Sequence, residues 1–291
     1  GNSVTPFKLN ALGLIVNMIL DPLLIFGLGP IPSLGVRGAA IATVFSQFIV
    51  TIVFIILGKQ SDAVYSHVNL FIKPDFEYIG KMVRLGFPPF VQTAIHSGIS
   101  MILTRIVADF GDTAVAVLNI GSQIESIAWM SAEGFSSAIS AFIGQNFGAG
   151  KTDRIKKGYY RGIQILGGIG IFASLLLIFG AKPLFTLFTP RDPIAIVEGI
   201  KYLRILGTCQ FFMCIEIGTA GAFNGIGKTL PPTLIGVIFN ISRIPLALAL
   251  SSTKLGLLGI WWSMSISSIA KGIISPIIYN YVLKNRLEEL I

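Results

Sequence analysis

Long apolar segments follow one another along almost the whole chain, and short polar segments separate them. Each apolar segment has roughly 20 residues or more, the length that an α-helix needs to cross the hydrocarbon core of a bilayer. Their Ile, Val, Phe and Gly residues show no period-2 alternation with polar residues, so a transmembrane β-barrel is a poor interpretation. The pattern predicts eight transmembrane helices, at about 7–29, 38–58, 86–108, 113–145, 161–187, 199–223, 230–251 and 257–283.

The composition agrees with this pattern. Of the 291 residues, 53% are hydrophobic and 12% are charged, and the mean hydropathy is +0.78. A soluble globular domain carries about twice that charged fraction. We therefore expect an all-α, polytopic membrane protein, since a soluble protein would need a core of helices that are apolar on every side.

The formal net charge of +8 is distributed unevenly between the two sides of the membrane. Thirteen Lys and Arg residues fall in segments on one side and six on the other, an asymmetry that places both ends of the chain in the cytoplasm. The charge therefore indicates topology, and nucleic acid is not an expected partner. The thirteen are Lys8, Lys59, Lys73, Lys81, Arg84, Lys151, Arg154, Lys156, Lys157, Arg161, Lys228, Lys284 and Arg286.

Motifs near the start of the chain recur, in the same order, 221 to 224 residues later. Six predicted spans lie between equivalent points, so the two copies have the same orientation and form a parallel repeat. The second copy is complete and the first is represented by its final third, which predicts a two-lobed protein of about twelve helices with roughly 160 residues before Gly1. The matched pairs are Gly1/Gly225, Thr5/Thr229, Asn17/Asn240, Pro22/Pro245, Leu34/Leu255, Gly35/Gly256 and Gly38/Gly259.

The repeat and the only long polar connection divide the chain into four parts. Residues 1–58 are expected to be the last two helices of the N-terminal lobe, and residues 59–82 a cytoplasmic linker. A six-helix C-terminal lobe is expected over residues 83–285, followed by a cytoplasmic tail at 286–291.

Four carboxylic acids lie inside the apolar segments: Asp21, Glu125, Glu133 and Glu216. Each ionisable group near the bilayer centre costs roughly 2.5–3.5 kcal/mol, so the four are expected to face an internal cavity or to have partners. Arg243 and His96 are further intramembrane candidates.

One predicted helix carries two of these acids. Glu125 and Glu133 lie about 80° apart around it and about 12 Å apart along it, so they can border one cavity without sharing a proton. Asn119 and Gln123 add polarity to neighbouring faces, which favours this helix as the wall of a cavity. The structural alternatives are that Glu125 pairs with Arg105 or Lys271, that Glu133 lies near a helix end, and that Asp21 braces Arg37.

Carboxylates in a low-dielectric cavity suggest a mechanism of exchange, because their charged form is disfavoured there. A proton, a sodium ion or an organic cation can each neutralise such a group, and competition between them couples the entry of one to the release of another. Aromatic side chains could stack on flat cationic compounds. The candidates for stacking are Phe90, Trp129, Phe135, Phe211 and Phe212.

Several motifs resemble the multidrug and toxic compound extrusion (MATE) family. They are Gly144–Lys151 (GQNFGAGK), Leu85–Pro88 (LGFP), the stretch Asn17–Gly27 with Asp21-Pro22, and Leu34–Ala40 (LGVRGAA). The resemblance covers the whole chain as helices five to twelve of such a protein. It implies a monomeric, secondary-active antiporter of the cell membrane that exports organic and often cationic compounds in exchange for H⁺ or Na⁺ and needs no other cofactor.

The family pattern is matched only in part at the cation site. Where members commonly have an acid about ten residues after the Gly of the GFP motif, this chain has His96. Glu216 approximately matches a second acid of the family, which implies a possible Na⁺ ligand there and leaves the coupling ion open.

Three other functions fit the sequence less well. An exporter of lipid-linked oligosaccharides shares the two-lobed architecture and would favour a cationic cavity. A membrane enzyme would need clustered metal ligands or a nucleophile with a base, and Cys209 and Cys214, in one apolar segment, fit neither a metal site nor a disulfide framework. A scaffold or receptor would rarely show a duplicated lobe.

Overall fold

The computed structural model describes residues 4–27, 32–60 and 75–285, with the side chains of 58–60 left out. Every regular element in these ranges is an α-helix, as the sequence predicts. The chain forms two compact units, Gly1–Pro74 and Asp75–Ile291. Most of the expected linker (59–82) and all of the expected tail (286–291) lie outside the described residues, whereas residues 76–82 are helical.

The first unit is a hairpin of two helices, α1 (Val4–Phe26) and α2 (Val36–Gln60). Gly35 immediately precedes α2 and has a φ of 54°, a conformation that glycine adopts without strain. The amide of Leu34 donates to the carbonyl of Leu24 over 2.9 Å. Gly38 lies so close to the backbone of Leu24 that any side chain there would collide with it.

The last hairpin of the second unit repeats this turn. It consists of α9 (Leu230–Ser251) and α10 (Leu257–Asn285). Gly256 has a φ of 50°, and Gly259 lies against the backbone of Leu250 as Gly38 lies against Leu24. The repeat read from the sequence therefore has the same glycine-dependent turn in both copies.

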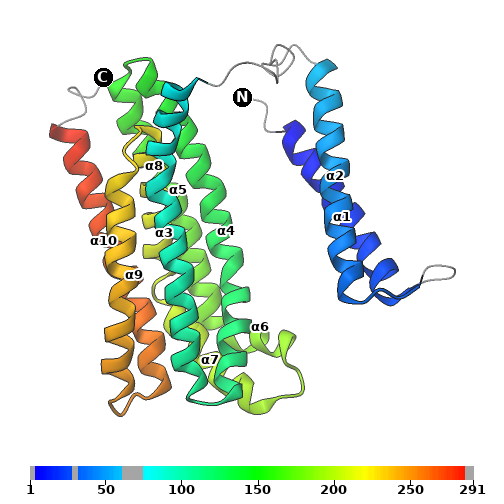
Figure 1. Cartoon of the computed structure of the whole chain (residues 1–291). Coiled ribbons are helices and arrows are strands. Elements are labelled where there is room, and N and C mark those ends of the chain that lie inside the picture. The colour runs from blue at the N-terminus through cyan, green and yellow to red at the C-terminus, as the bar shows by residue number, and fades with distance from the viewer. Residues whose placement is uncertain (1–3, 28–31, 61–74, 286–291) are drawn as a thin grey trace. The chain divides into compact units, whose positions relative to one another are not determined.

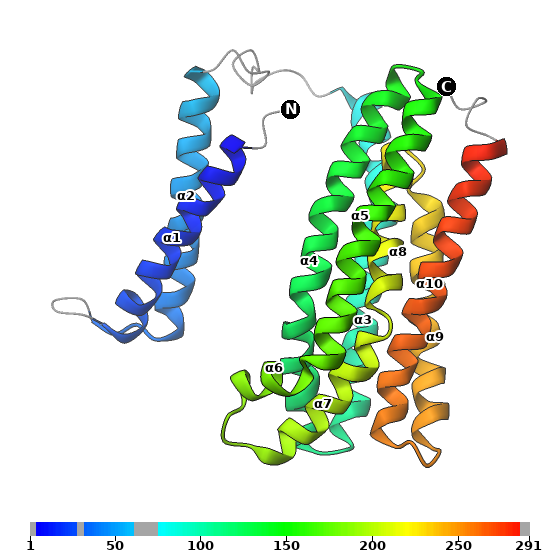
Figure 2. The ribbon, with the colours of Figure 1, turned by 180° about the vertical axis from the view of Figure 1, so that it is seen from behind.

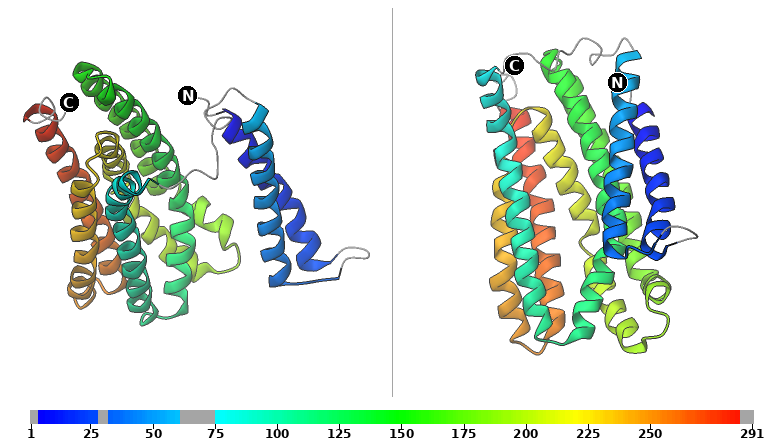
Figure 3. Two further views of the ribbon diagram at one scale, coloured as in Figure 1. Left: turned by 45° about the horizontal axis from the view of Figure 1, so that its top comes forward. Right: turned by 45° about the vertical axis from the view of Figure 1, so that its right-hand side comes forward.

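The second unit is a bundle of long helices (Figures 1 and 2). The turns α4–α5 and α8–α9, the start of α3 and the end of α10 lie at one end of the bundle, and the turns α3–α4 and α9–α10 lie at the other (Figure 1). Figure 3 shows α3 beside α9 from two further directions, and the two helices pack together. Before α9 and α10 the order is α3 (Phe76–Ala108), α4 (Asp112–Gly148), α5 (Thr152–Phe179), α6 (Ala181–Phe188), α7 (Pro193–Gly207) and α8 (Gln210–Gly225).

Six helices in the described ranges are long and apolar enough to cross a membrane: α1, α2, α3, α5, α9 and α10. The bent pair α7 and α8 would form a seventh span. The 37-residue α4 is longer than any of these, but its polar side chains reduce its apolar character. The eight predicted segments thus correspond to these seven spans and α4.

The core of the second unit consists of two apolar clusters at different heights. The first contains Tyr202 and Trp261, whose rings meet edge to face with centroids 4.8 Å apart. The second contains Phe223 and Tyr279, also edge to face at 4.8 Å. Many large apolar side chains on the outside remain exposed, which is the surface that a bilayer requires.

Candidate functional site

Polar and charged side chains lie between the two apolar clusters of the second unit. On α4 the first cluster ends at Ile124 and the second begins at Ala132; on α10 the first extends to Ile269 and the second begins at Ile278. Mid-span sites of this kind are where transporters hold substrates and coupling ions. The polar layer, as we call it, comprises the half-buried Glu125 together with the buried Gln210, Glu216, Arg243, Ser267, Ser268 and Lys271.

A break between α7 and α8 positions one of these residues. The two helices are bent by 49° relative to each other. At the break, the hydroxyl of Thr208 donates to the carbonyl of Ile205 (2.6 Å) and lies 2.9 Å from the hydroxyl of Ser265. Side chains thus satisfy backbone groups that a continuous helix would pair, and Gln210 becomes the first residue of α8.

Glu125 of α4 reaches this break. The side-chain amide of Gln210 donates to Glu125 Oε2 over 3.2 Å and to the carbonyl of Leu206 over 3.1 Å. The Tyr202 hydroxyl lies beside Glu125. One turn earlier on the same face of α4, Gly121 leaves room for the Tyr202 ring, which any side chain at position 121 would strike. The sequence of α4 therefore builds a recess for Tyr202 directly next to its carboxylate.

Glu216 of α8 and Lys271 of α10 form an ion pair with 3.3 Å between Oε2 and Nζ. Both side chains are almost completely buried, at 11% and 9% exposed. Gly272 makes the approach possible, because it lies directly on the backbone of Phe212, one turn before Glu216. The two opposite charges stabilise each other in an environment where either alone would be costly.

Arg243 of α9 is buried and donates hydrogen bonds to two neutral hydroxyl groups of α10. Its Nε donates to the hydroxyl of Ser267 (2.6 Å) and its Nη2 to the hydroxyl of Ser268 (3.0 Å). Glu125 and Glu216 are close enough to interact with its charge electrostatically. The guanidinium group therefore lies within electrostatic reach of both acids of the polar layer, without a direct salt bridge to either in the described residues.

The remaining candidates of this unit lie on its surface: His96 of α3 and Asn119, Gln123 and Glu133 of α4 are exposed. His96 is within electrostatic reach of Arg243, Lys271 and Glu216, and Glu133 is within reach of Glu216. Among the aromatic candidates, Phe90, Trp129 and Phe135 are exposed, and Phe211 and Phe212 are half-buried. The structure thus places two exposed polar side chains, His96 and Glu133, near the buried polar layer.

Two structural alternatives for Glu125 are wrong. Arg105 pairs with Asp109 at 3.2 Å on the surface, and Lys271 pairs with Glu216. Asp21 lies in the first unit, half-buried, where it accepts a hydrogen bond from Asn17 over 3.4 Å.

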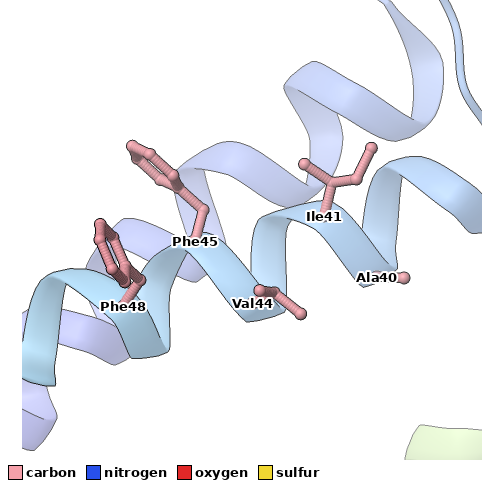
Figure 4. A pocket seen from close by; sticks show the side chains of 5 residues that line it. All are labelled: Ala40, Ile41, Val44, Phe45 and Phe48. Carbon is pink, nitrogen blue, oxygen red and sulfur yellow. The ribbon is translucent and has the colours of Figure 1, made fainter.

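Within the described residues, no group of three His, Cys, Asp or Glu side chains could hold a metal ion. Both Cys209 and Cys214 are free and buried. A depression on α2 is lined by Ala40, Ile41, Val44, Phe45 and Phe48 (Figure 4). It offers no polar group that could orient a ligand, so we do not regard it as part of the site.

Sequence reasoning missed Gln210, Tyr202 and the two serines that bind Arg243. Gln210 could have been identified, since a lone Gln inside an apolar segment needs a hydrogen-bonding partner to offset the cost of burying its amide. Tyr202 and the serines carried no such signal, because their polarity matters only through the neighbours that folding brings to them.

The fold and the polar layer together define the class: a helical membrane protein with charged groups held inside its bundle, as in secondary transporters. The sequence model of the MatE family matches residues 88–249. The probable multidrug resistance protein NorM of Thermotoga maritima is 31% identical over 98% of this chain. The chain belongs to the MatE family, the transporters of multidrug and toxic compound extrusion.

Two further proteins are similar to this chain. The FAD transporter of Shewanella oneidensis is 29% identical over 94% of this chain. A multidrug resistance MATE family transporter solved in an outward-facing conformation has a TM-score of 0.86 at 22% identity, covering 95% of this chain and 62% of that one. The chain spans 59% of the NorM protein and 60% of the FAD transporter.

Proposed function

We propose that this chain is part of a secondary-active exporter that exchanges small organic compounds for H⁺ or Na⁺ by alternating access. The observation that carries the proposal is the polar layer, in which the half-buried Glu125 and the buried Glu216, Arg243 and Lys271 lie between apolar clusters of a membrane bundle. Charged groups at this depth are costly and commonly mark ion or substrate pathways. The printed names of the relatives, multidrug resistance protein and FAD transporter, support export of small molecules.

The exposed surface near the polar layer is the proposed contact for the transported compound. His96, Asn119, Gln123 and Glu133 would supply hydrogen bonds and charge, and Trp129 would supply an aromatic face. Glu133 has no cationic partner among the described residues, which favours organic cations as substrates.

In the complete protein, we propose that residues 1–58 end an N-terminal lobe and that residues 83–285 form the C-terminal lobe of a monomer in the plasma membrane, with both chain ends cytoplasmic. Asp21 would then serve the first lobe. A Na⁺ ion at Glu216 would have to displace the ammonium group of Lys271, which already neutralises that carboxylate. A coupling ion bound elsewhere in the lobe is therefore the simpler arrangement.

The test is to express the full-length protein in efflux-deficient cells and to follow ethidium extrusion with and without gradients of pH and Na⁺. We expect extrusion that stops when the coupling gradient is collapsed. Absence of gradient-dependent extrusion for every dye tried would contradict the proposal. Export of lipid-linked saccharides is not favoured, since none of the relatives named above is described as such an exporter.

A further inference from the structure

Side chains join α5 and α10 near the end of the bundle that carries the α4–α5 turn. The Tyr160 hydroxyl of α5 donates to Oδ1 of Asn280 on α10 over 3.0 Å. Next to this exposed hydrogen bond, the buried rings of Tyr159 and Tyr279 lie with their centroids 4.4 Å apart. Figure 2 shows α8 between α5 and α10, and α8 packs against both helices. The α5–α10 seam, which we define by Tyr160 and Asn280, is therefore a place where two outer helices meet in front of a third.

Basic side chains of both helices lie around this seam. On α5, Lys157 precedes Tyr160 by three residues and Arg161 by four, so it is a neighbour of both on the helix surface. On α10, Lys284 follows Asn280 by four residues. All three basic side chains are exposed, and none of them forms an ion pair within the described residues. Their positive charges are therefore available to a partner from outside the chain.

Few acidic groups oppose these charges. The helix α10 contains no Asp or Glu, and α5 contains only Asp153, in its first turn, with Arg154 and Lys156 on either side. The guanidinium group of Arg161 donates over 3.1 Å to Oε1 of Gln164, which is a neutral acceptor. The seam therefore attracts an anionic group and repels a cationic one.

The side chains near the seam change from polar to apolar along the bundle. Tyr160 and Tyr281 are exposed, and tyrosine rings are enriched at the level of the lipid headgroups. Further along α5, Phe172 and Leu175 are exposed, and nothing lies within 4 Å of a methyl group added at Gly168. A basic rim next to an open apolar surface is complementary to a phospholipid, which carries its charge on the headgroup and its apolar surface on the acyl chains.

The seam is separate from the residues proposed to contact the transported compound. Those residues belong to α3 and α4, and α3 lies in front in Figure 1, whereas α5, α8 and α10 lie in front when the bundle is seen from behind in Figure 2. A ligand at the seam therefore approaches the bundle from the face opposite to α3.

We propose that the α5–α10 seam binds one anionic phospholipid, phosphatidylglycerol, from the leaflet on this side of the membrane. Arg161 and Lys284 hold the phosphate group, one from each helix, and the acyl chains lie along α5 beside Gly168. Basic pockets between transmembrane helices recognise lipid headgroups in this way. The inference goes beyond the proposed function, since it depends neither on the transported compound nor on the coupling ion.

The experiment is native mass spectrometry of the purified full-length protein in a neutral detergent, titrated with phosphatidylglycerol or with the neutral phosphatidylcholine. We expect the wild type to retain one phosphatidylglycerol in preference to phosphatidylcholine. Arg161→Gln and Lys284→Gln should each weaken binding about fivefold, the contribution of one basic residue near an anionic lipid surface. Equal binding of the two lipids by the wild type would overturn the proposal.

The matched control is Arg84→Gln, which removes the same charge from α3 at the same end of the bundle, where the side chain is also exposed. It should bind phosphatidylglycerol as the wild type does. If Arg84→Gln and Arg161→Gln weaken binding equally, the lipid is attracted by the basic end as a whole, and a site at the seam is contradicted.

A phosphate arm separates a lipid site from a site for a soluble anion. The titration is repeated with millimolar inorganic phosphate, and the proposal requires the lipid to stay bound; its displacement would overturn the proposal. No transported compound is present, so failure to bind the lipid and failure to export a dye are independent results.

Discussion

Removing one partner of a buried ion pair destabilises a protein far more than replacing both partners by apolar residues. Glu216 and Lys271 are each about one-tenth exposed, so removing either leaves a single charge inside the bundle. Breaking such a pair from one side costs about 3–5 kcal/mol, whereas apolar replacement of both partners is often neutral. Each charge of the pair is therefore needed mainly because it neutralises the other.

We predict that Lys271→Met lowers the thermal stability of the detergent-solubilised protein strongly, and that Lys271→Met combined with Glu216→Met recovers most of the loss. The measurement is thermal unfolding followed by circular dichroism. Lys201→Met, at the more exposed pair with Glu198, is the control and should cost less than about 1 kcal/mol. Equal effects of the two lysine changes would contradict the burial argument.

Gly121 is predicted to be essential for the position of Tyr202. A methyl group at this position would meet the tyrosine ring, so Gly121→Ala should cost about 1–3 kcal/mol through overpacking. Gly134→Ala is the matched control on the same helix, because nothing lies near its added methyl group and alanine favours helix. Thermal unfolding distinguishes the two, and a harmless Gly121→Ala would show that Tyr202 lies elsewhere.

At the level of single helices, the break between α7 and α8 depends on both local sequence and tertiary contacts. Hydropathy alone predicts one segment over 199–223, and the structure divides that stretch between Gly207 and Gln210. The division depends on Ser265 of α10, which donates to the Ile205 carbonyl over 3.3 Å, together with Thr208. A residue 60 positions away contributes to the break, so no local pattern could reveal it.

We predict that Thr208→Val loosens this break. The substitution keeps the shape of the side chain but removes the hydroxyl that serves Ile205 and Ser265, at a cost of about 1–3 kcal/mol for the buried groups left unpaired. Hydrogen exchange of peptides covering residues 203–214 should accelerate. Thr104→Val in α3, whose exposed hydroxyl bonds only within its own helix, should leave the exchange of that region unchanged.

The ends of other helices can be explained in the same way. Some depend on nearby residues in the sequence, and others on close packing. The helix predicted from residue 86 begins at Phe76, because Asp75 caps it by accepting hydrogen bonds from the amides of Glu77 and Tyr78. That cap was readable from the sequence. The segment predicted over 161–187 ends at Phe179 instead, and α6 begins after Gly180, where a side chain would strike the carbonyl of Leu176.

The candidate site could also be predicted from the sequence only in part. Apolar surroundings in the sequence identified Glu125, Glu216 and Arg243 as intramembrane, and all three lie in the polar layer. Their partners could not be predicted, since each contact joins different helices: α4 with α8, α8 with α10, and α9 with α10.

For the molecule as a whole, the turns at the two ends of the bundle in the second unit predict a membrane topology that can be tested. The α4–α5 turn with its lysines and the α9–α10 turn lie at opposite ends of the second unit (Figure 1). We predict that a cysteine at Lys157→Cys reacts with a membrane-impermeant maleimide only from the cytoplasmic side, and one at Lys254→Cys only from outside. Both positions are exposed, whereas the native Cys209 and Cys214 are buried. The reverse labelling would contradict the positive-inside orientation.

The proposed exchange has one direct consequence for the complete protein: if an organic cation is the substrate, its binding must release the coupling ion. The measurement is the pH of a weakly buffered solution of purified full-length protein when ethidium is added. We expect the wild type and Glu198→Gln to release a proton or, read with a sodium electrode, a sodium ion, and Glu125→Gln to release neither. Ethidium binding to the wild type without release of either ion would contradict the proposed exchange.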